Sequence, residues 1–187
     1  MNLLILDNYD SFTYNLVHLI EKVSNIPFEV HRNDNISLKD VEAFDKILLS
    51  PGPGIPTESG ILLDVIKTYG STKSIFGVCL GLQAIGEAYG GKLKNLSQVY
   101  HGIASPIQII EQDKIFTNCP NEFSVGRYHS WVVDKSSVPA SLKVLAIDHE
   151  QNIMALKHTT HDVKGVQFHP ESILSEYGET IMKNWLQ

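Results

Sequence analysis

Up to about residue 90, short apolar runs alternate with stretches in which apolar residues recur at helical spacing. The apolar runs have the length of β-strands and occupy residues 3–6, 28–31, 46–50 and 74–76. The helical stripes include residues 16–23 and residues 61–69. A chain that alternates strands and helices in this way forms a parallel sheet with helices on both faces. The sequence therefore predicts an α/β fold built on an open, mostly parallel, doubly wound sheet.

From residue 92 onward the pattern changes to short segments rich in strand-forming residues and separated by turns. These segments are residues 104–110, 130–133, 142–147, 153–157 and 163–168, and a final helical pattern covers roughly residues 177–186. No linker, low-complexity segment or internal repeat separates the two parts. A length of 187 residues is also typical of one domain. We therefore expect one mixed α/β domain over residues 1–187, with a smaller β-rich portion in its second half.

A cysteine lies where the fourth predicted strand meets its helix. Residues 77–81 read G-V-C-L-G, and glycines on both sides of Cys79 permit a sharp turn with a strained central residue. This is the pattern of a nucleophile elbow, with sulfur in place of the more familiar serine. The dipole of the following helix would stabilise a thiolate at this position. A cysteine on a strand is more often simply buried, but these glycines and a distant H-P-E sequence favour Cys79 as a nucleophile.

The H-P-E sequence is His169, Pro170 and Glu171, at the end of the last predicted strand. Proline holds the residue before it in an extended conformation, so side chains two residues apart emerge on the same side. Glu171 can then orient the imidazole of His169 while the other ring nitrogen faces a nucleophile. A surface loop is the alternative for an isolated H-P-E sequence. Its place at the carboxyl end of a strand, where α/β sheets carry their sites, favours a functional pair.

A second loop leaves the carboxyl end of the third predicted strand. Residues 51–54 read P-G-P-G, so prolines stiffen the loop while glycines let a ligand approach the backbone closely. The loop could be only a rigid turn, and it lacks the spacing of a phosphate-binding loop. Beside an activated cysteine it is better interpreted as half of an oxyanion hole, paired with the N–H of Leu80.

Composition excludes several classes of function. The net charge is −6, and no basic stripe is present to bind nucleic acid. No apolar run approaches the ~20 residues of a membrane span, and the N-terminus has no signal-peptide pattern. The two cysteines, Cys79 and Cys119, make no disulfide framework and have no zinc-ligand spacing, and Cys119 lies in a loop-like stretch with no predicted role. We expect a cytoplasmic protein without a metal, nucleic-acid or membrane partner.

The remaining histidines are mostly isolated in the sequence, and a solvated or core position is the simpler interpretation for each. His129 is the one histidine whose neighbours in the sequence suggest contact with a ligand. It lies in R-Y-H-S-W, residues 127–131, where polar and aromatic groups are dense enough for ligand contact.

Four of these segments together carry a family resemblance. Residues 77–83, G-V-C-L-G-L-Q, and residues 165–172, G-V-Q-F-H-P-E-S, resemble the class I (triad) glutamine amidotransferases. Residues 7–15, D-N-Y-D-S-F-T-Y-N, and residues 50–54, S-P-G-P-G, narrow the resemblance further. The chain looks like the small glutaminase subunit of chorismate-utilising synthases, either para-aminobenzoate (aminodeoxychorismate) synthase component II or anthranilate synthase component II. The resemblance covers essentially the whole chain and implies a flavodoxin-like layering of helices and sheet.

The resemblance also implies roles for individual residues. Cys79 would be the nucleophile, His169 the base and Glu171 the residue that orients the base. The implied glutamine and oxyanion contacts are Gly52, Gly54, Leu80, Gln83, Ser130 and Trp131. Among these residues, Gly52 and Leu80 would supply the backbone N–H groups that bind the oxyanion. Trp131 stands where the family commonly has leucine, a change that a backbone contact would tolerate.

The implied reaction is hydrolysis of L-glutamine through a cysteinyl thioester, with no cofactor. The ammonia would pass to a chorismate-binding large subunit, because the chain looks too short to hold a chorismate site as well. Two other classes remain open: a stand-alone cysteine hydrolase of γ-glutamyl substrates, and a non-catalytic binding module. The intact set of Cys79, His169 and Glu171 argues against the binding module. The sequence leaves open whether the synthase serves folate synthesis, tryptophan synthesis or both.

Overall fold

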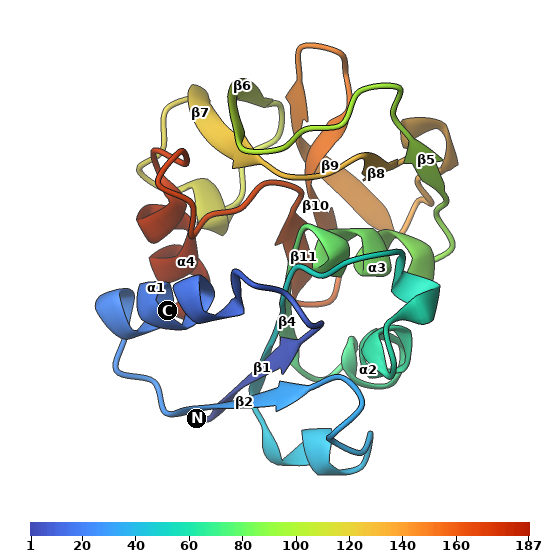
Figure 1. Ribbon diagram of the computed structural model, residues 1–187, viewed down its shortest axis with the longest axis vertical. Coiled ribbons are helices and arrows are strands. Elements are labelled where there is room, and N and C mark those ends of the chain that lie inside the picture. The colour runs from blue at the N-terminus through green and yellow to red at the C-terminus, as the bar shows by residue number, and fades with distance from the viewer.

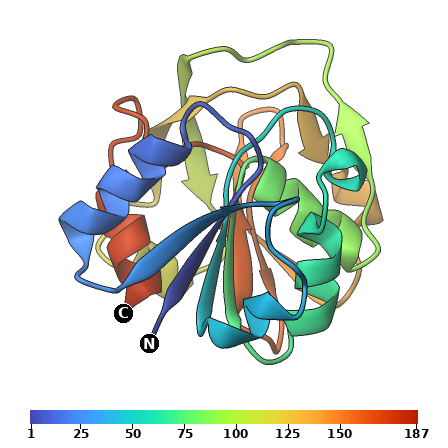
Figure 2. The ribbon, with the colours of Figure 1, turned by 60° about the horizontal axis from the view of Figure 1, so that its bottom comes forward.

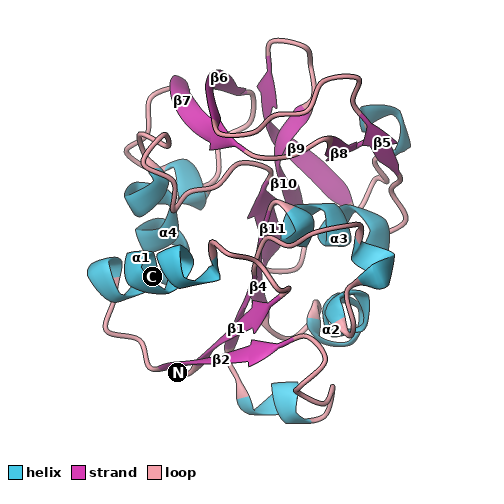
Figure 3. Cartoon of the chain, viewed as in Figure 1, coloured by secondary structure: helices cyan, strands magenta, loops and turns pink.

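A nine-stranded sheet runs through the molecule in the computed structural model, which describes all 187 residues. In spatial order its strands are β2 (Phe28–Arg32), β1 (Leu3–Asp7), β3 (Lys46–Leu49), β4 (Ser74–Val78), β11 (Val163–Val166), β10 (Ile153–His158), β9 (Leu142–Asp148), β6 (Ile103–Ile109) and β7 (Glu122–Arg127). A separate ribbon pairs β5 (Leu93–Asn95) with β8 (Trp131–Val133). The α-helices are α1 (Thr13–Val23), α2 (Leu62–Tyr69), α3 (Leu80–Ala88) and α4 (Gly178–Leu186). Four short 3₁₀ helices are η1 (Asp40–Ala43), η2 (Pro56–Glu58), η3 (Lys114–Phe116) and η4 (Lys135–Ser137). Figure 3 shows this mixture of helices and strands along the chain.

The first part of the sheet is parallel and doubly wound, as the sequence predicts. Strands β2, β1, β3, β4 and β11 pair in parallel. Helices α1 and α4 cover one face of these strands, and α2 and α3 cover the other (Figures 1 and 2). Successive residues of β1 therefore enter different cores: Leu3 and Ile5 pack on the α1 and α4 side, and Leu4 and Leu6 on the α2 and α3 side. All four side chains are fully buried, which explains the unbroken apolar run.

The remaining strands form the antiparallel, β-rich part of the fold. Strand β11 is parallel to β4 on one side and antiparallel to β10 on the other, so the change of direction occurs at β11. Beyond it, β10, β9, β6 and β7 are all antiparallel to their neighbours. Strands β5 and β7 are absent from the sequence prediction. β5 spans only three residues, and β7 ends in a glycine and an arginine that interrupt a strand-like pattern.

Loops that follow the parallel strands meet at one edge of the sheet. The loop after β1 is tied to the end of β3, because the backbone N–H of Asn8 donates to Oγ of Ser50 at 2.8 Å. The side-chain amide of Asn8 donates to the Ser50 carbonyl, also at 2.8 Å. The loops after β4 and β11 carry Cys79 and His169 to the same edge. No helix in the structure is long and apolar enough to cross a membrane.

Candidate active site

Cys79 occupies a strained turn between β4 and α3. Its φ of 53° and ψ of −101° lie in a region that few residues other than glycine adopt. The flanking glycines are required because the strand and the helix approach so closely. A Cβ added to Gly77 would lie 2.4 Å from the backbone of Gly81, and one added to Gly81 would lie 2.5 Å from the carbonyl oxygen of Leu49. The sharp, strained strand-to-helix turn that the sequence predicts is confirmed.

His169 and Glu171 form the hydrogen-bonded pair that the H-P-E sequence predicts. Nδ1 of His169 lies 2.6 Å from Oε1 of Glu171, and both side chains are almost completely buried. The imidazole packs edge-on against two aromatic rings that also contact each other, with centroid distances of 5.6 Å to Phe12 and 4.8 Å to Tyr128. Its other nitrogen, Nε2, is buried, and the Cys79 sulfur lies close enough to the imidazole to raise its pKa. The ring is therefore fixed in place with one nitrogen available for chemistry.

The electrostatic surroundings favour the protonated form of His169. Burial alone would lower the pKa of His169, but the neighbouring Cys79 sulfur and the Glu171 carboxylate raise it to about 10. A cationic imidazole beside the cysteine stabilises a thiolate and holds a proton that a leaving group can take.

A cavity of about 250 Å³ lies in front of Cys79. Its lining residues come from the P-G-P-G loop, α3 and the connection between β7 and β8: Gly52, Pro53, Gly54, Cys79, Gln83, Tyr128, His129, Ser130 and Trp131. The structure thus brings together around one cavity all the predicted glutamine contacts except Leu80. The side chain of Leu80 is buried and packs against the backbone at Gly52. His169 and Glu171 do not line the cavity.

Two backbone N–H groups beside the cavity have no partner within the chain. Neither Gly52 nor Leu80 donates a backbone hydrogen bond. Gly52 leaves no room for a side chain, because an added Cβ would lie 2.5 Å from the Asn8 carbonyl oxygen. Gly54 has a φ of +72°, which L-residues with side chains rarely adopt. The loop therefore needs glycine at both positions. The free N–H groups of Gly52 in this loop and of Leu80 in α3 are the donors that an oxyanion hole requires.

Gln83 connects the cavity to residues that the sequence analysis did not select. Its Nε2 donates to the carbonyl of Trp131 at 2.8 Å and to Oε1 of Gln167 at 3.3 Å. Gln167 in turn donates to Sγ of Cys79 at 3.5 Å. Gln167 lies in the same G-V-Q-F-H-P-E-S segment as His169, so its place two residues before the histidine is the only sequence signal for it.

His129 lines the cavity and belongs to a buried polar network. Its Nε2 accepts a hydrogen bond from Nε of Arg127 at 3.1 Å, and its Nδ1 lies 3.1 Å from the Trp131 carbonyl. Arg127 is fully buried and pairs with Asp148 at 2.8 Å. Burial, followed by the charge of Arg127, lowers the pKa of His129 to about 3. The ring is therefore neutral at working pH, and it acts on the cavity through the Trp131 backbone.

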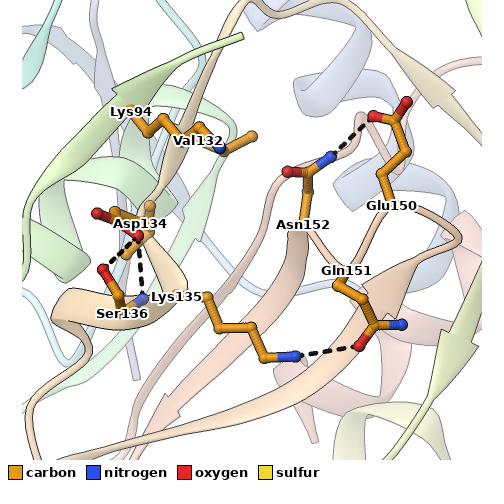
Figure 4. Close-up of a pocket in the computed structure, with 9 residues that line it drawn as sticks. Lys94, Val132, Asp134, Lys135, Ser136, Glu150, Gln151 and Asn152 are labelled. Atoms are coloured by element: carbon orange, nitrogen blue, oxygen red, sulfur yellow. Dashed lines mark hydrogen bonds between the residues drawn. The ribbon is translucent and has the colours of Figure 1, made fainter.

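A larger cavity, of about 410 Å³, lies between the β5–β8 ribbon and the turn that joins β9 to β10 (Figure 4). Charged and amide side chains line it, and Nζ of Lys135 donates to Oε1 of Gln151 at 3.1 Å. None of the predicted site residues lines this cavity, and its lining includes neither cysteine nor histidine. Cys119 is equally unsuited to chemistry, because burial raises the pKa of its thiol to about 11. No cluster of histidine, cysteine and carboxylate side chains could hold a metal ion.

Comparisons with known proteins give one consistent family. A family model described as glutamine amidotransferase class-I matches residues 4–187. The chain is 45% identical to aminodeoxychorismate synthase component 2 of Escherichia coli, over 98% of each protein. It is 43% identical to anthranilate synthase component 2 of Pseudomonas aeruginosa, over 99% of this chain and 94% of that protein. A solved glutamine amidotransferase structure from Thermotoga maritima shares the fold, with a TM-score of 0.75 at 15% identity over 91% of this chain and 76% of that one.

Proposed function

The chain belongs to the class-I glutamine amidotransferase family, and from that premise we propose that Cys79, His169 and Glu171 release ammonia from L-glutamine for a chorismate-utilising synthase. The observation that carries the proposal is the placement of Cys79 in a strained turn at the end of a 250 Å³ cavity, beside the buried pair of His169 and Glu171. The predicted fold and enzyme class are both confirmed by the comparisons.

The mechanism begins with attack by the Cys79 thiolate on the carboxamide carbon of glutamine. The negative charge that develops on the carboxamide oxygen is bound by the free N–H groups of Gly52 and Leu80. Each donor of this kind contributes ~3 kcal/mol to the transition state. His169 then gives its proton to the departing ammonia, which leaves a γ-glutamyl thioester on Cys79. In the second half of the reaction His169 takes a proton from water, and the hydrolysed thioester releases glutamate.

The cavity fits a substrate of the size of one amino acid. Its volume of about 250 Å³ is below the ~300–1,000 Å³ of sites for drug-sized ligands. Gln83 uses its Nε2 within the chain and leaves Oε1 without a partner, so this oxygen can accept from the α-ammonium group of glutamine. The backbone of Ser130 and Trp131, beside Gln83, completes the contacts with the α-amino and α-carboxyl ends.

The ammonia must reach its acceptor through an enclosed path, because water would otherwise protonate it. The two relatives are named as components of two different chorismate-utilising synthases, and we propose a chorismate-binding large subunit as the partner of this chain. Two apolar side chains lie exposed on loops that follow β1 and β11: Tyr9, 48% exposed, and Ile173, fully exposed. These loops meet at the edge that carries the triad, and this edge is therefore the proposed docking face.

The proposal is tested by measuring glutamate release and aromatic product with the purified chain and each candidate large subunit. We expect slow release by the isolated chain, and faster release when the correct subunit and chorismate are added. The aromatic product, aminodeoxychorismate or anthranilate, then identifies the pathway. Full activity in isolation that neither subunit changes would instead show a stand-alone hydrolase of γ-glutamyl substrates. The absence of glutamate release under all conditions would contradict the proposal.

A further inference from the structure

The sulfur of Cys79 accepts a hydrogen bond from Gln167. Nε2 of Gln167 lies 3.5 Å from Sγ, so the amide N–H donates to the sulfur. Gln167 is fully buried. The imidazole of His169 also lies beside the sulfur, which raises the pKa of the ring. The resting nucleophile is therefore contacted by an amide as well as by the catalytic base.

The direction of this hydrogen bond is set by a second amide. Gln83 must turn its Nε2 toward the Trp131 carbonyl, because a carbonyl can only accept. The second hydrogen of the same Nε2 then meets an oxygen, which fixes Oε1 of Gln167 on the Gln83 side. The remaining end of the Gln167 amide is its NH₂ group, and it faces the sulfur. The orientation of Gln167 thus follows from the network and not from an arbitrary choice of amide rotamer.

A buried ion pair lies on the other side of the Trp131 carbonyl. Arg127 can only donate, so Nε2 of His129 accepts from it and the proton of the neutral ring lies on Nδ1. Nδ1 therefore donates to the Trp131 carbonyl, which also accepts a hydrogen bond from Nε2 of Gln83. Arg127 itself is fixed by Asp148, and both side chains are fully buried. The Trp131 carbonyl thus accepts hydrogen bonds from both sides, and the two donors hold it in place.

We propose that Gln167 is a catalytic residue whose amide N–H binds Sγ of Cys79, stabilises the thiolate and aims it into the cavity, while Gln83 orients the Gln167 amide. The effect of this contact on glutamine turnover rests on the proposed function, whereas its effect on the ionisation of Cys79 does not. A hydrogen bond to a charged acceptor is worth roughly tenfold or more in an equilibrium. A donor that favours the thiolate over the thiol therefore increases the fraction of reactive sulfur near neutral pH.

The test measures the alkylation rate of Cys79 by iodoacetamide as a function of pH, in a Cys119→Ser background so that one thiol reacts. Gln167→Met keeps the length and burial of the side chain but removes the donor. Near pH 7 we expect alkylation about tenfold slower than in the parent, with the midpoint of the pH profile about one unit higher. Well above the midpoints of both profiles, the two rates should converge. This convergence separates a loss of thiolate stabilisation from a loss of access or packing.

The matched control is Asn184→Leu, which removes another partly buried amide, one that donates to the carbonyls of Ile115 and Thr117 and holds α4 to η3. It should lower the melting temperature and leave the alkylation profile of Cys79 unchanged. If Gln167→Met fails to fold, Gln167→Asn, which retracts the donor by one methylene, is subject to the same expectations. Profiles that coincide at every pH, or rates that fall equally at every pH, would overturn the proposal.

Alkylation requires neither glutamine nor a partner, so this result stands apart from the proposed function. An altered profile in a chain that never releases glutamate would support the role of Gln167 in ionising Cys79 and contradict the proposed function. Normal glutaminase activity with an unaltered profile would do the reverse.

Discussion

Replacement of Gly52 by alanine tests how strongly the reaction depends on the P-G-P-G loop. The added Cβ would lie 2.5 Å from the carbonyl oxygen of Asn8, 2.6 Å from its Cβ and 2.8 Å from Cδ2 of Leu80. Real Cβ atoms do not approach other atoms so closely, so something must move. Asn8 is held by two hydrogen bonds to Ser50 and cannot yield easily. We therefore expect the loop to shift and to carry the N–H of residue 52 away from the oxyanion.

The magnitude follows from the contribution of one donor. A loss of ~3 kcal/mol of transition-state stabilisation lowers kcat by about a hundredfold, at 1.36 kcal/mol for each factor of ten. The donor acts on the developing oxyanion more than on the neutral carboxamide, so KM for glutamine should change much less than kcat. The assay is glutamate release by the chain with its activating large subunit, measured over a range of glutamine concentrations.

Gly90→Ala supplies the control for the cost of a side chain at a glycine. Gly90 has a φ of +101°, so an alanine is strained there, but no atom lies within 4 Å of the added Cβ. This variant should lose stability, measured as a lower melting temperature, and keep its kcat. A Gly52→Ala variant that retained kcat within about threefold of the parent, or that raised KM alone, would show that the N–H of residue 52 does not bind the oxyanion.

Four further predictions concern the triad. Cys79→Ser should abolish glutamate release and leave the melting temperature close to that of the parent, because a hydroxyl has no comparable ionised fraction near neutral pH; release at near the parental rate would rule out the nucleophile. His169→Ala should lower kcat more than Glu171→Gln, because alanine removes the proton carrier while glutamine keeps a hydrogen-bonding shape; the opposite order would show that the two roles are wrongly assigned. The imidazole of His169 should titrate near pH 10 by NMR, and at lower pH in Cys79→Ala, because the sulfur is one of the groups that raise its pKa. Because the pKa of His169 is higher in the folded than in the unfolded chain, protonation of His169 stabilises the fold. This stabilisation is complete below pH 6.5, the ordinary pKa of histidine, and is lost as the pH rises toward about 10. The free energy of unfolding should therefore decrease over that interval in the parent more than in His169→Ala, and equal slopes would contradict the shift.

The parallel half of the sheet was predictable because burial leaves a direct mark on its sequence. Residues 3–6 and 46–49 are covered by helices on both faces, so they have no exposed side and read as unbroken apolar runs. The turn at Cys79 was predictable for a similar reason, since only glycines allow β4 and α3 to approach so closely. In these segments the local sequence and the tertiary environment impose the same requirement.

The network behind the cavity was not predictable, because its members are brought together only by folding. An arginine at the end of an apolar stretch is normally taken to mark a surface. Arg127 is instead fully buried, since Asp148 on β9 and Ser105 on β6 lie within reach of its guanidinium group. The contact between Gln167 and Cys79 joins residues 88 positions apart. Residue spacing in the sequence does not predict such a pair. The contact becomes evident only when β4 and β11 are seen to be neighbours in the sheet.

The change of strand direction at β11 has a consequence for motion and ligand binding. Cys79 and the P-G-P-G loop belong to the parallel half, whereas residues 128–131 on the facing wall follow β7, at the far edge of the antiparallel half. A glutamine that touches both walls adds a contact between two halves that are already joined at β11 and by the hydrogen bond from Gln83 to the Trp131 carbonyl. Occupancy therefore couples the local opening equilibria of the two halves. Slow amide hydrogen exchange should spread from the parallel core into the connection between β7 and β8 once the cavity is filled.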